Sequence, residues 1–369
     1  MKRQLLGVAA ILLSISTYAQ DNPLWMRYCA ISPDGTTIAF TYKGDIYTVP
    51  STGGRASQIT TNPAHDTKPI WSPDGKKIAF ASDRMGSMDI FEVNKEGGIP
   101  KRLTTHSGNE TPVAYKDAGH ILFLANIMPT AEDAQFPSGQ FQQVYEVNTE
   151  GGRPILFSSM PMEDISINHT GNTLLYHDKK GYEDPWRKHH TSSITRDIWL
   201  CSLNGNRTFR KQTAFNGEDR TPVWASDDKS FYYLSEEKGS FNIFKRDIDG
   251  NTSKQITNHT KHPVRFLSAA SNGTLCYGYD GEIYTVKEGA IPQKVQISIV
   301  TDKNDKDLIR QIKRSGATEI SLSPDAKEIA FVLRGDVYVT STEYSTTKQI
   351  TNTPQQERDI HFSPDGRSI

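Results

Sequence analysis

The sequence predicts an all-β protein: a six-bladed β-propeller of four-stranded antiparallel blades, followed by the start of a second propeller. A phrase of the type SPDG-x-x-IAF occurs at residues 32–40 and 72–80 and, with alanine in place of glycine, at 323–331. Each copy is followed by an Asp-Ile-Tyr type segment and then by a Gln-Ile-Thr type segment. The turn glycines Gly35 and Gly75 are 40 residues apart, which is close to the length of a propeller blade. Each period therefore predicts one blade.

The chemistry of the phrase explains the first two strands of each blade. Proline presets the backbone angle of a tight turn, aspartate bonds its own backbone, and glycine accepts a positive φ. The flanks, such as Trp71 and Ile78–Phe80, are aromatic, β-branched or small and apolar, which is typical of strands. The turn therefore joins two antiparallel strands, and the Asp-Ile-Tyr and Gln-Ile-Thr segments supply the third and fourth.

Weaker copies of the turn fill the middle of the chain. Counted from Gly35, the turns lie at Gly35, Gly75, Gly119, Gly171, Asp228 and Gly273, and the next unit begins at Asp325. Repeated four-stranded sheets of this period bury their faces on one another when they are arranged radially. A β-sandwich is the alternative. The sequence has no Trp-Asp pair and no recurring Gly-His pair, which argues against a WD40 propeller.

Four segments are predicted along the chain. Residues 1–20 are a signal peptide, 22–298 the six-bladed propeller, 299–316 a charged linker, and 317–369 the first blade and one strand of a second, truncated propeller. A seventh blade of the same ring is the alternative for the last segment. One blade and a strand cannot close a ring, so we expect the chain to be the N-terminal part of a longer protein.

The N-terminus predicts export. Lys2 and Arg3 precede an apolar run, Leu5–Leu13, and then small residues up to Ala19, which is the pattern of a secretory signal peptide cleaved after Ala19 or Gln20. The apolar run is shorter than the ~17–25 residues that span a bilayer, so we favour a signal peptide over the alternative of a membrane anchor. We expect a periplasmic protein, and the signal is equally compatible with an extracellular one.

Composition narrows the partners. The chain has 42 basic and 43 acidic residues, so no strong field exists to attract nucleic acid or an anionic membrane surface. The three cysteines, Cys29, Cys201 and Cys276, are sparse and far apart in sequence. This pattern predicts buried single thiols and not a disulfide framework or a metal cluster.

No local motif predicts catalysis. The sequence contains no Gly-x-Ser-x-Gly, no His-Glu-x-x-His and no phosphate-binding glycine loop. We therefore predict no catalytic residue in this chain and no cofactor. His259 and His262 have a spacing that a metal could use, but no further ligand accompanies them, and we favour a surface loop without metal.

The best candidate for a site is an insertion at Tyr176–Arg196, which we assign to the third blade. It lengthens the interval between Gly171 and Asp228 to 57 residues. Its aromatic and basic residues are candidates to bind the carboxylate end of a peptide in a pH-sensitive way: Trp186, Arg187, Lys188, His189 and His190. The alternative, which we favour, is that Trp186 pins the loop and the charges are solvated.

The signal peptide, the repeat and above all residues 183–199 resemble the N-terminal half of bacterial tricorn protease homologues. The resemblance covers essentially all of the mature chain. It implies a parent serine peptidase, a role in gating or channelling peptides or unfolded segments to a distal peptidase domain of the same polypeptide, and assembly as a homo-oligomer. The family's catalytic serine and histidine belong to that distal part, and no position here matches them.

The repeat alone is only moderately specific, so two other readings stay open. A non-enzymatic propeller similar to TolB of the Tol system would scaffold protein partners in the periplasm. The propeller of a dipeptidyl-peptidase-like enzyme would precede an α/β-hydrolase domain and often carries a glutamate pair for the substrate amine. No such motif is evident near Glu163, Glu183 or Glu218.

Overall fold

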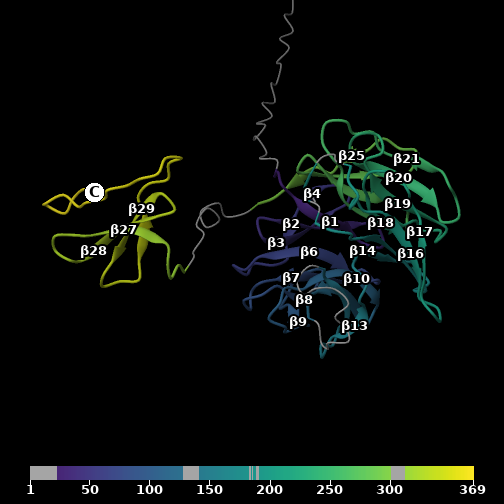
Figure 1. Cartoon of the computed structure of the whole chain (residues 1–369), viewed down its shortest axis with the longest axis horizontal. Coiled ribbons are helices and arrows are strands. Elements are labelled where there is room, and N and C mark those ends of the chain that lie inside the picture. The colour runs from purple at the N-terminus through teal and green to yellow at the C-terminus, as the bar shows by residue number, and fades with distance from the viewer. Residues whose placement is uncertain (1–22, 128–140, 183, 185, 188–190, 301–311) are drawn as a thin grey trace, which may run out of the picture. The chain divides into compact units, whose positions relative to one another are not determined.

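The computed structural model describes residues 23–127, 141–182, 184, 186–187, 191–300 and 312–369, and the chain divides into two compact units, 1–300 and 301–369. The regular secondary structure in the described residues consists of β-strands alone (Figure 1), so the predicted all-β fold is confirmed. No helix in these ranges is long and apolar enough to cross a membrane. The predicted signal peptide and most of the predicted linker lie outside the described residues, and the domain boundaries stay predictions.

The described part of the first unit contains six four-stranded antiparallel sheets. The first three comprise β1 (Arg27–Ile31), β2 (Thr37–Tyr42), β3 (Asp45–Pro50) and β5 (Ser57–Gln58); β6 (Asp66–Trp71), β7 (Lys77–Ser82), β8 (Asp89–Asn94) and β9 (Lys101–Arg102); and β10 (Thr111–Asp117), β11 (His120–Ala125), β12 (Gln143–Asn148) and β13 (Ile155–Ser158). The last three comprise β14 (Met162–Ile167), β15 (Thr173–Asp178), β16 (Ile198–Ser202) and β17 (Thr208–Lys211); β18 (Asp219–Trp224), β19 (Ser230–Ser235), β20 (Asn242–Asp247) and β21 (Ser253–Gln255); and β22 (Arg265–Ala269), β23 (Leu275–Tyr279), β24 (Glu282–Val286) and β25 (Gln293–Lys294).

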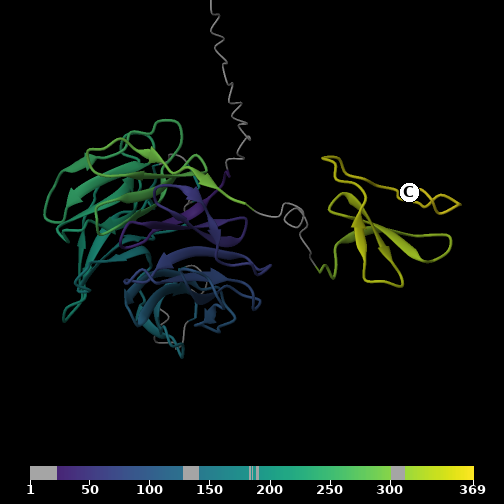
Figure 2. The same cartoon turned by 180° about the vertical axis from the view of Figure 1, so that it is seen from behind.

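The six sheets form a closed ring around their first strands. In chain order, β1 contacts β6, β6 contacts β10, and the series continues through β14 and β18 to β22, which contacts β1. The purple and green ends of this unit lie in one body in both views (Figure 1, Figure 2). The ring is fastened by a short parallel pair, in which β26 (Ile297–Ser298) joins β4 (Gly54–Arg55). The last segment of the unit therefore returns to its first sheet.

The repeated residues build the same hydrogen bonds in successive sheets. Ser32 accepts from the amide of Thr37 at 3.0 Å and donates to Asp34 at 2.5 Å, which closes the tight turn in which Gly35 has a φ of 77°. The threonine of the Gln-Ile-Thr segment accepts from the isoleucine amide of the Asp-Ile-Tyr segment, as in Ile46 to Thr60 at 2.9 Å. Equivalent bonds join Ile90 to Thr104, Ile198 to Thr213, Ile243 to Thr257 and Val337 to Thr351. The repeat is thus a set of local bonds that fix each sheet.

The core lies between neighbouring sheets. Ile38 and Phe40 of β2 are fully buried, and Ile78 and Phe80 of β7 occupy the equivalent positions in the second sheet. Burying one such side chain contributes about 1.5–3 kcal/mol. Because each sheet packs on both neighbours, the hydrophobic effect favours the closed ring over separate sheets.

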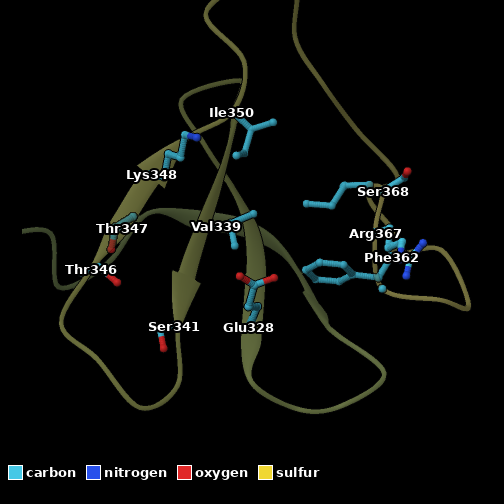
Figure 3. Close-up of a pocket in the computed structure, with 12 residues that line it drawn as sticks. Glu328, Val339, Ser341, Thr346, Thr347, Lys348, Ile350, Phe362, Arg367 and Ser368 are labelled. Carbon is cyan, nitrogen blue, oxygen red and sulfur yellow. The ribbon is translucent and has the colours of Figure 1, made fainter.

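The second unit contains one four-stranded sheet of β27 (Ala317–Leu322), β28 (Glu328–Leu333), β29 (Asp336–Ser341) and β30 (Thr347–Gln349). Ile360 and Phe362 of the following segment pack on this sheet. Figure 3 shows Phe362 and Ile350 at a shallow hollow beside Val339. Ile350 is 49% exposed, so the segment covers the apolar face only in part. That this sheet begins a second propeller stays a prediction.

Candidate functional site

The first strands of five sheets carry the same backbone irregularity. Each pairing with the second strand shifts register at a β-bulge, and one residue of the bulge has a left-handed φ of 47–58°. These residues are Tyr28, Lys68, Asp164, Thr221 and Phe266. Such a conformation costs a residue other than glycine about 1–2 kcal/mol, and strain of this kind gathers at functional positions. The third sheet has Pro112 at the equivalent place, and a proline ring cannot adopt a positive φ.

The bulge residues contact one another between neighbouring first strands. The rings of Tyr28 and Phe266 lie 4.8 Å apart, and the Lys68 ammonium lies 5.8 Å from the Tyr28 ring centroid. In the fourth and fifth sheets, the Thr221 hydroxyl donates to Asp164 at 2.6 Å. The bulges therefore place an aromatic and basic group on one part of the ring and a polar and acidic group on another.

A long segment between β15 and β16 reaches these strands, and we call residues 179–197 the strap. The insertion predicted at Tyr176–Arg196 is corrected in two respects. It lies in the fourth sheet and not the third, and it starts later, because Tyr176 to Asp178 are still paired with β16 or β14. The later start was not evident from the sequence, because β15 continues beyond its apolar residues into the polar residues His177 and Asp178.

Trp186 of the strap docks between the sixth and first sheets. Its ring lies 6.0 Å from that of Phe266, and the guanidinium carbons of Arg27 and Arg265 lie 4.8 and 5.1 Å from its centroid. Arg265 also donates to the carbonyl oxygens of Trp186 at 2.7 Å and Arg187 at 3.3 Å. Cation–π contacts of this kind contribute about 0.5–2 kcal/mol each. Trp186 therefore pins the strap to strands from two other sheets.

Arg187 holds the strap to the fifth sheet. Its guanidinium forms an ion pair with Glu218 and lies 3.4 Å from Glu236, and both carboxylates are fully buried. Arg196 donates to Glu218 at 2.8 Å and Arg220 lies 3.5 Å from it. The prediction that the strap's charges are solvated therefore does not describe Arg187, which lies in a buried charge network.

The network sets the ionisation of its members. Burial acts to raise the pKa of Glu218, but the charges of Arg196, Arg220 and Arg187 hold it below its usual value. Burial lowers the pKa of Arg220 to about 10. Burial also acts to raise the pKa of Glu163, and the neighbouring His177, at 3.2 Å, and Lys179, at 2.7 Å, bring it well below its usual range. At neutral pH these carboxylates are therefore ionised and paired.

The structure places only part of the predicted binding set. Trp186 and Arg187 are adjacent to the ring of bulge residues, whereas Lys188, His189 and His190 lie outside the described residues. Sequence reasoning missed Arg27 and Arg265. Both precede the bulge residue of their strand, as Arg220 does in the fifth sheet, so alignment of the repeats on the bulge would have singled out this position.

No group of three or more metal-ligating side chains gathers in the part of the chain that the structure describes. The two histidines with metal-like spacing take other roles. His259 stacks on Tyr279 with ring centroids 3.9 Å apart and bonds the Tyr277 hydroxyl at 3.0 Å, while His262 lies 3.5 Å from Asp280. Burial lowers the pKa of His259. Glu218 and Glu163 are each paired with basic side chains, and Glu183 lies outside the described residues.

Comparisons with known proteins agree with this architecture. A family model described as "Tricorn protease N-terminal beta propeller domain" matches residues 23–290. Tricorn protease homolog 1 of Streptomyces coelicolor is 24% identical over 339 residues, which are 90% of this chain and 30% of that protein. The tricorn protease homolog of Saccharolobus solfataricus is 27% identical over 295 residues, 76% of this chain and 26% of that protein. The crystal structure of the tricorn protease superposes with a TM-score of 0.66 at 19% identity, covering 90% of this chain and 32% of that one. The chain thus spans about a third or less of these relatives.

Proposed function

We propose a function on the basis that this chain belongs to the tricorn protease N-terminal β-propeller family, which confirms the resemblance predicted from its sequence. The chain is the propeller module of an exported tricorn-like serine peptidase. It gates or channels peptides and unfolded segments to a peptidase domain in another part of the polypeptide. Its own residues bind and select, and they perform no bond cleavage.

The observation that carries this proposal is the position of Trp186 in the strap. It leaves and re-enters the fourth sheet, yet Trp186 contacts Arg27 of the first sheet and Phe266 of the sixth. In a ring of six, the first and fourth sheets lie opposite each other. Trp186 therefore lies across the ring from the sheet to which the strap is connected. We infer that the strap narrows a route through the propeller.

The chemistry at the crossing supports selection of extended peptides. Trp186 is 43% exposed, and two guanidinium groups flank its ring. An indole with adjacent cations offers van der Waals contact to a passing side chain and charge-assisted hydrogen bonds to a carboxylate. Arg187 contributes less charge than its sequence suggests, because Glu218 and Glu236 neutralise it.

The test compares peptide hydrolysis by the complete gene product with that by the 369-residue chain, with and without a serine-directed inhibitor. We expect inhibitable cleavage by the complete product and none by the chain. In the complete product, Trp186→Ala should change the ratio of rates for long and short peptides. Tyr182→Ala is the matched control, because Tyr182 lies in the same segment and is 85% exposed.

Each part of the proposal has a result that opposes it. Cleavage by the 369-residue chain alone would show that the peptidase site is not distal. If Trp186→Ala leaves the preference for peptide length unchanged, the strap takes no part in gating. If neither protein cleaves and the chain captures envelope proteins, the scaffold reading replaces the peptidase one.

Export is a separate part of the proposal and rests on the sequence of residues 1–20. We expect the mature protein to be recovered from the periplasmic fraction. N-terminal sequencing should then begin at Gln20 or Asp21. A cytoplasmic protein that retains Met1 would contradict export.

A further inference from the structure

Two cysteines that lie far apart in the sequence meet at the seam where the ring closes. Cys29 is in β1 of the first sheet and Cys276 in β23 of the sixth, and both belong to one buried cluster between these sheets. Cα atoms of β1 and β23 approach to within 8 Å. Both thiols are buried and unbridged in the structure, and the Cys29 thiol donates to the carbonyl oxygen of Phe266 at 3.5 Å. The prediction of buried single thiols is confirmed, since all three cysteines are buried and free, and two of them lie in the cluster at this seam.

The surrounding backbone independently fixes this proximity. Ser268 of β22 is the direct cross-strand partner of Cys276. Its hydroxyl lies 3.4 Å from the carbonyl oxygen of Cys29 and 3.5 Å from that of Cys276, and it accepts from the amide of Ile31 at 3.0 Å. One side chain thus connects the backbones of both cysteines. Cys201, in the fourth sheet, belongs to a different cluster.

We propose that Cys29 and Cys276 form a disulfide bond that closes the ring covalently between its first and last sheets. Without it, the closure consists of the parallel pair of β26 with β4, hydrogen bonds such as Met26 to Gly281 at 3.1 Å, and apolar packing. A covalent link at this seam removes loop-closure freedom from the unfolded chain, and the loop it closes has about 250 residues, for which the entropic effect is large. The site is independent of any peptidase function.

The bond forms by exchange with a disulfide donor. One cysteine thiolate attacks a donor sulfur and releases the donor's first thiolate, and the second cysteine thiolate then displaces the other donor thiolate. Two protons leave the protein, the cysteines are oxidised, and the donor is reduced to two thiols. Burial raises the pKa of the Cys276 thiol, and exchange requires a thiolate with access to the donor. The link therefore forms as the ring closes during folding and exchanges slowly afterwards.

The test uses the whole 369-residue chain, refolded in a mixture of oxidised and reduced glutathione. The refolded chain is denatured without reductant and alkylated. We expect one alkyl group, on Cys201, and a proteolytic fragment that joins Cys29 to Cys276, whereas reduction first gives three alkyl groups. Three groups without reduction, or a link that includes Cys201, would overturn the proposal.

Stability provides the second measurement. Reductant should lower the thermal midpoint of the oxidised chain by about 5–10 °C, given the loop length and the size of the unit. Cys201→Ser should keep both the link and this shift, and Cys29→Ser should lose both. If Cys29→Ser fails to fold, the comparison of the oxidised and reduced parent chain still decides. A link without a midpoint shift would refute its role in closing the ring.

Discussion

Replacing Glu218 by glutamine tests whether the buried charge network holds the strap and the fifth sheet together. Glu218 is fully buried, and the side chains of its three arginine partners are at most 11% exposed. Glu218→Gln keeps the shape of the side chain and removes its charge. Three guanidinium groups then share the remaining carboxylates, chiefly Glu236 and Glu163.

The expected magnitude follows from burial. Removing one partner of a buried ion pair costs about 3–5 kcal/mol, because the remaining charge is left uncompensated in a poorly solvated site. Arg187→Ala leaves Glu218 paired with Arg196 and Arg220, but it removes the cation beside the buried Glu236, so we expect a comparable cost of about 3–5 kcal/mol. In the double variant the two costs should fall short of additivity by about 1–2 kcal/mol, since both changes remove the same ion pair.

The ionisation of Glu218 also predicts how the stability difference between the parent and Glu218→Gln changes with pH. The pKa of Glu218 is held below its usual value of 4.5 in the folded chain. Its contribution to stability is therefore complete above pH of about 4.5 and is lost as pH falls towards the folded-state pKa. Glu218→Gln should lack this part of the acid-side loss.

The assay is equilibrium unfolding in urea at pH 7 and at intervals down to pH 3, with tryptophan fluorescence as the signal that reports unfolding. We expect the free energy of unfolding of Glu218→Gln to be well below that of the parent at pH 7, with the difference shrinking in acid. A loss under 1 kcal/mol at pH 7, or a difference that stays constant with pH, would refute the idea that ionised Glu218 organises the network.

Three further predictions concern other parts of the ring. Burial raises the pKa of Glu110 to about 7, so a charged carboxylate is disfavoured at this site. Glu110→Gln should therefore stabilise the chain by about 2–3 kcal/mol at pH 8 and by little at pH 4.5. Equal effects on the free energy of unfolding in urea at the two pH values would contradict this prediction. A Cβ at Gly53 would lie 2.7 Å from the backbone oxygen of Gln296, just before β26, whereas a Cβ at Gly97 would meet nothing nearer than 3.7 Å, and both glycines have a positive φ. Gly53→Ala should therefore destabilise the chain by at least about 1 kcal/mol more than Gly97→Ala. Equal losses of unfolding free energy would show that the ring closure tolerates the added methyl group. Trp186→Ala should speed limited proteolysis of the strap severalfold while Tyr182→Ala leaves it unchanged, and no change in Trp186→Ala would mean that other contacts hold the strap.

The propeller was predictable because its determinants are local. The turn at Ser32 to Gly35 and the bond from Ile46 to Thr60 each connect residues that are close in sequence. Proline, aspartate, glycine and β-branched residues carry that information in their own conformational preferences. The repeat therefore reveals the sheets, and the regular period reveals that they are alike.

The strap's docking site was not predictable from the same information. Trp186 meets Arg265, which lies 79 residues further along the chain, and Arg27 of the first sheet. The pairing of Cys29 with Cys276 likewise depends on closure of the whole ring. Neither contact leaves a local pattern, because the residues meet only after every sheet has taken its place.

The bulges explain how a uniform repeat produces a ring with distinct sides. Within each sheet, the hydrogen bonds of the tight turn and of the cross-strand threonine require particular residue types at their own positions. The residue before the bulge takes part in neither set of bonds, so its type can differ from sheet to sheet. In the first, fifth and sixth sheets it is arginine, and in the fourth it is Glu163. Strap contacts exploit this difference, since Trp186 binds at Arg27 and Arg265, while Arg187 shares Glu218 with Arg220. The contacts made to the strap can therefore change at one position of each sheet without disturbing the bonds that fold it.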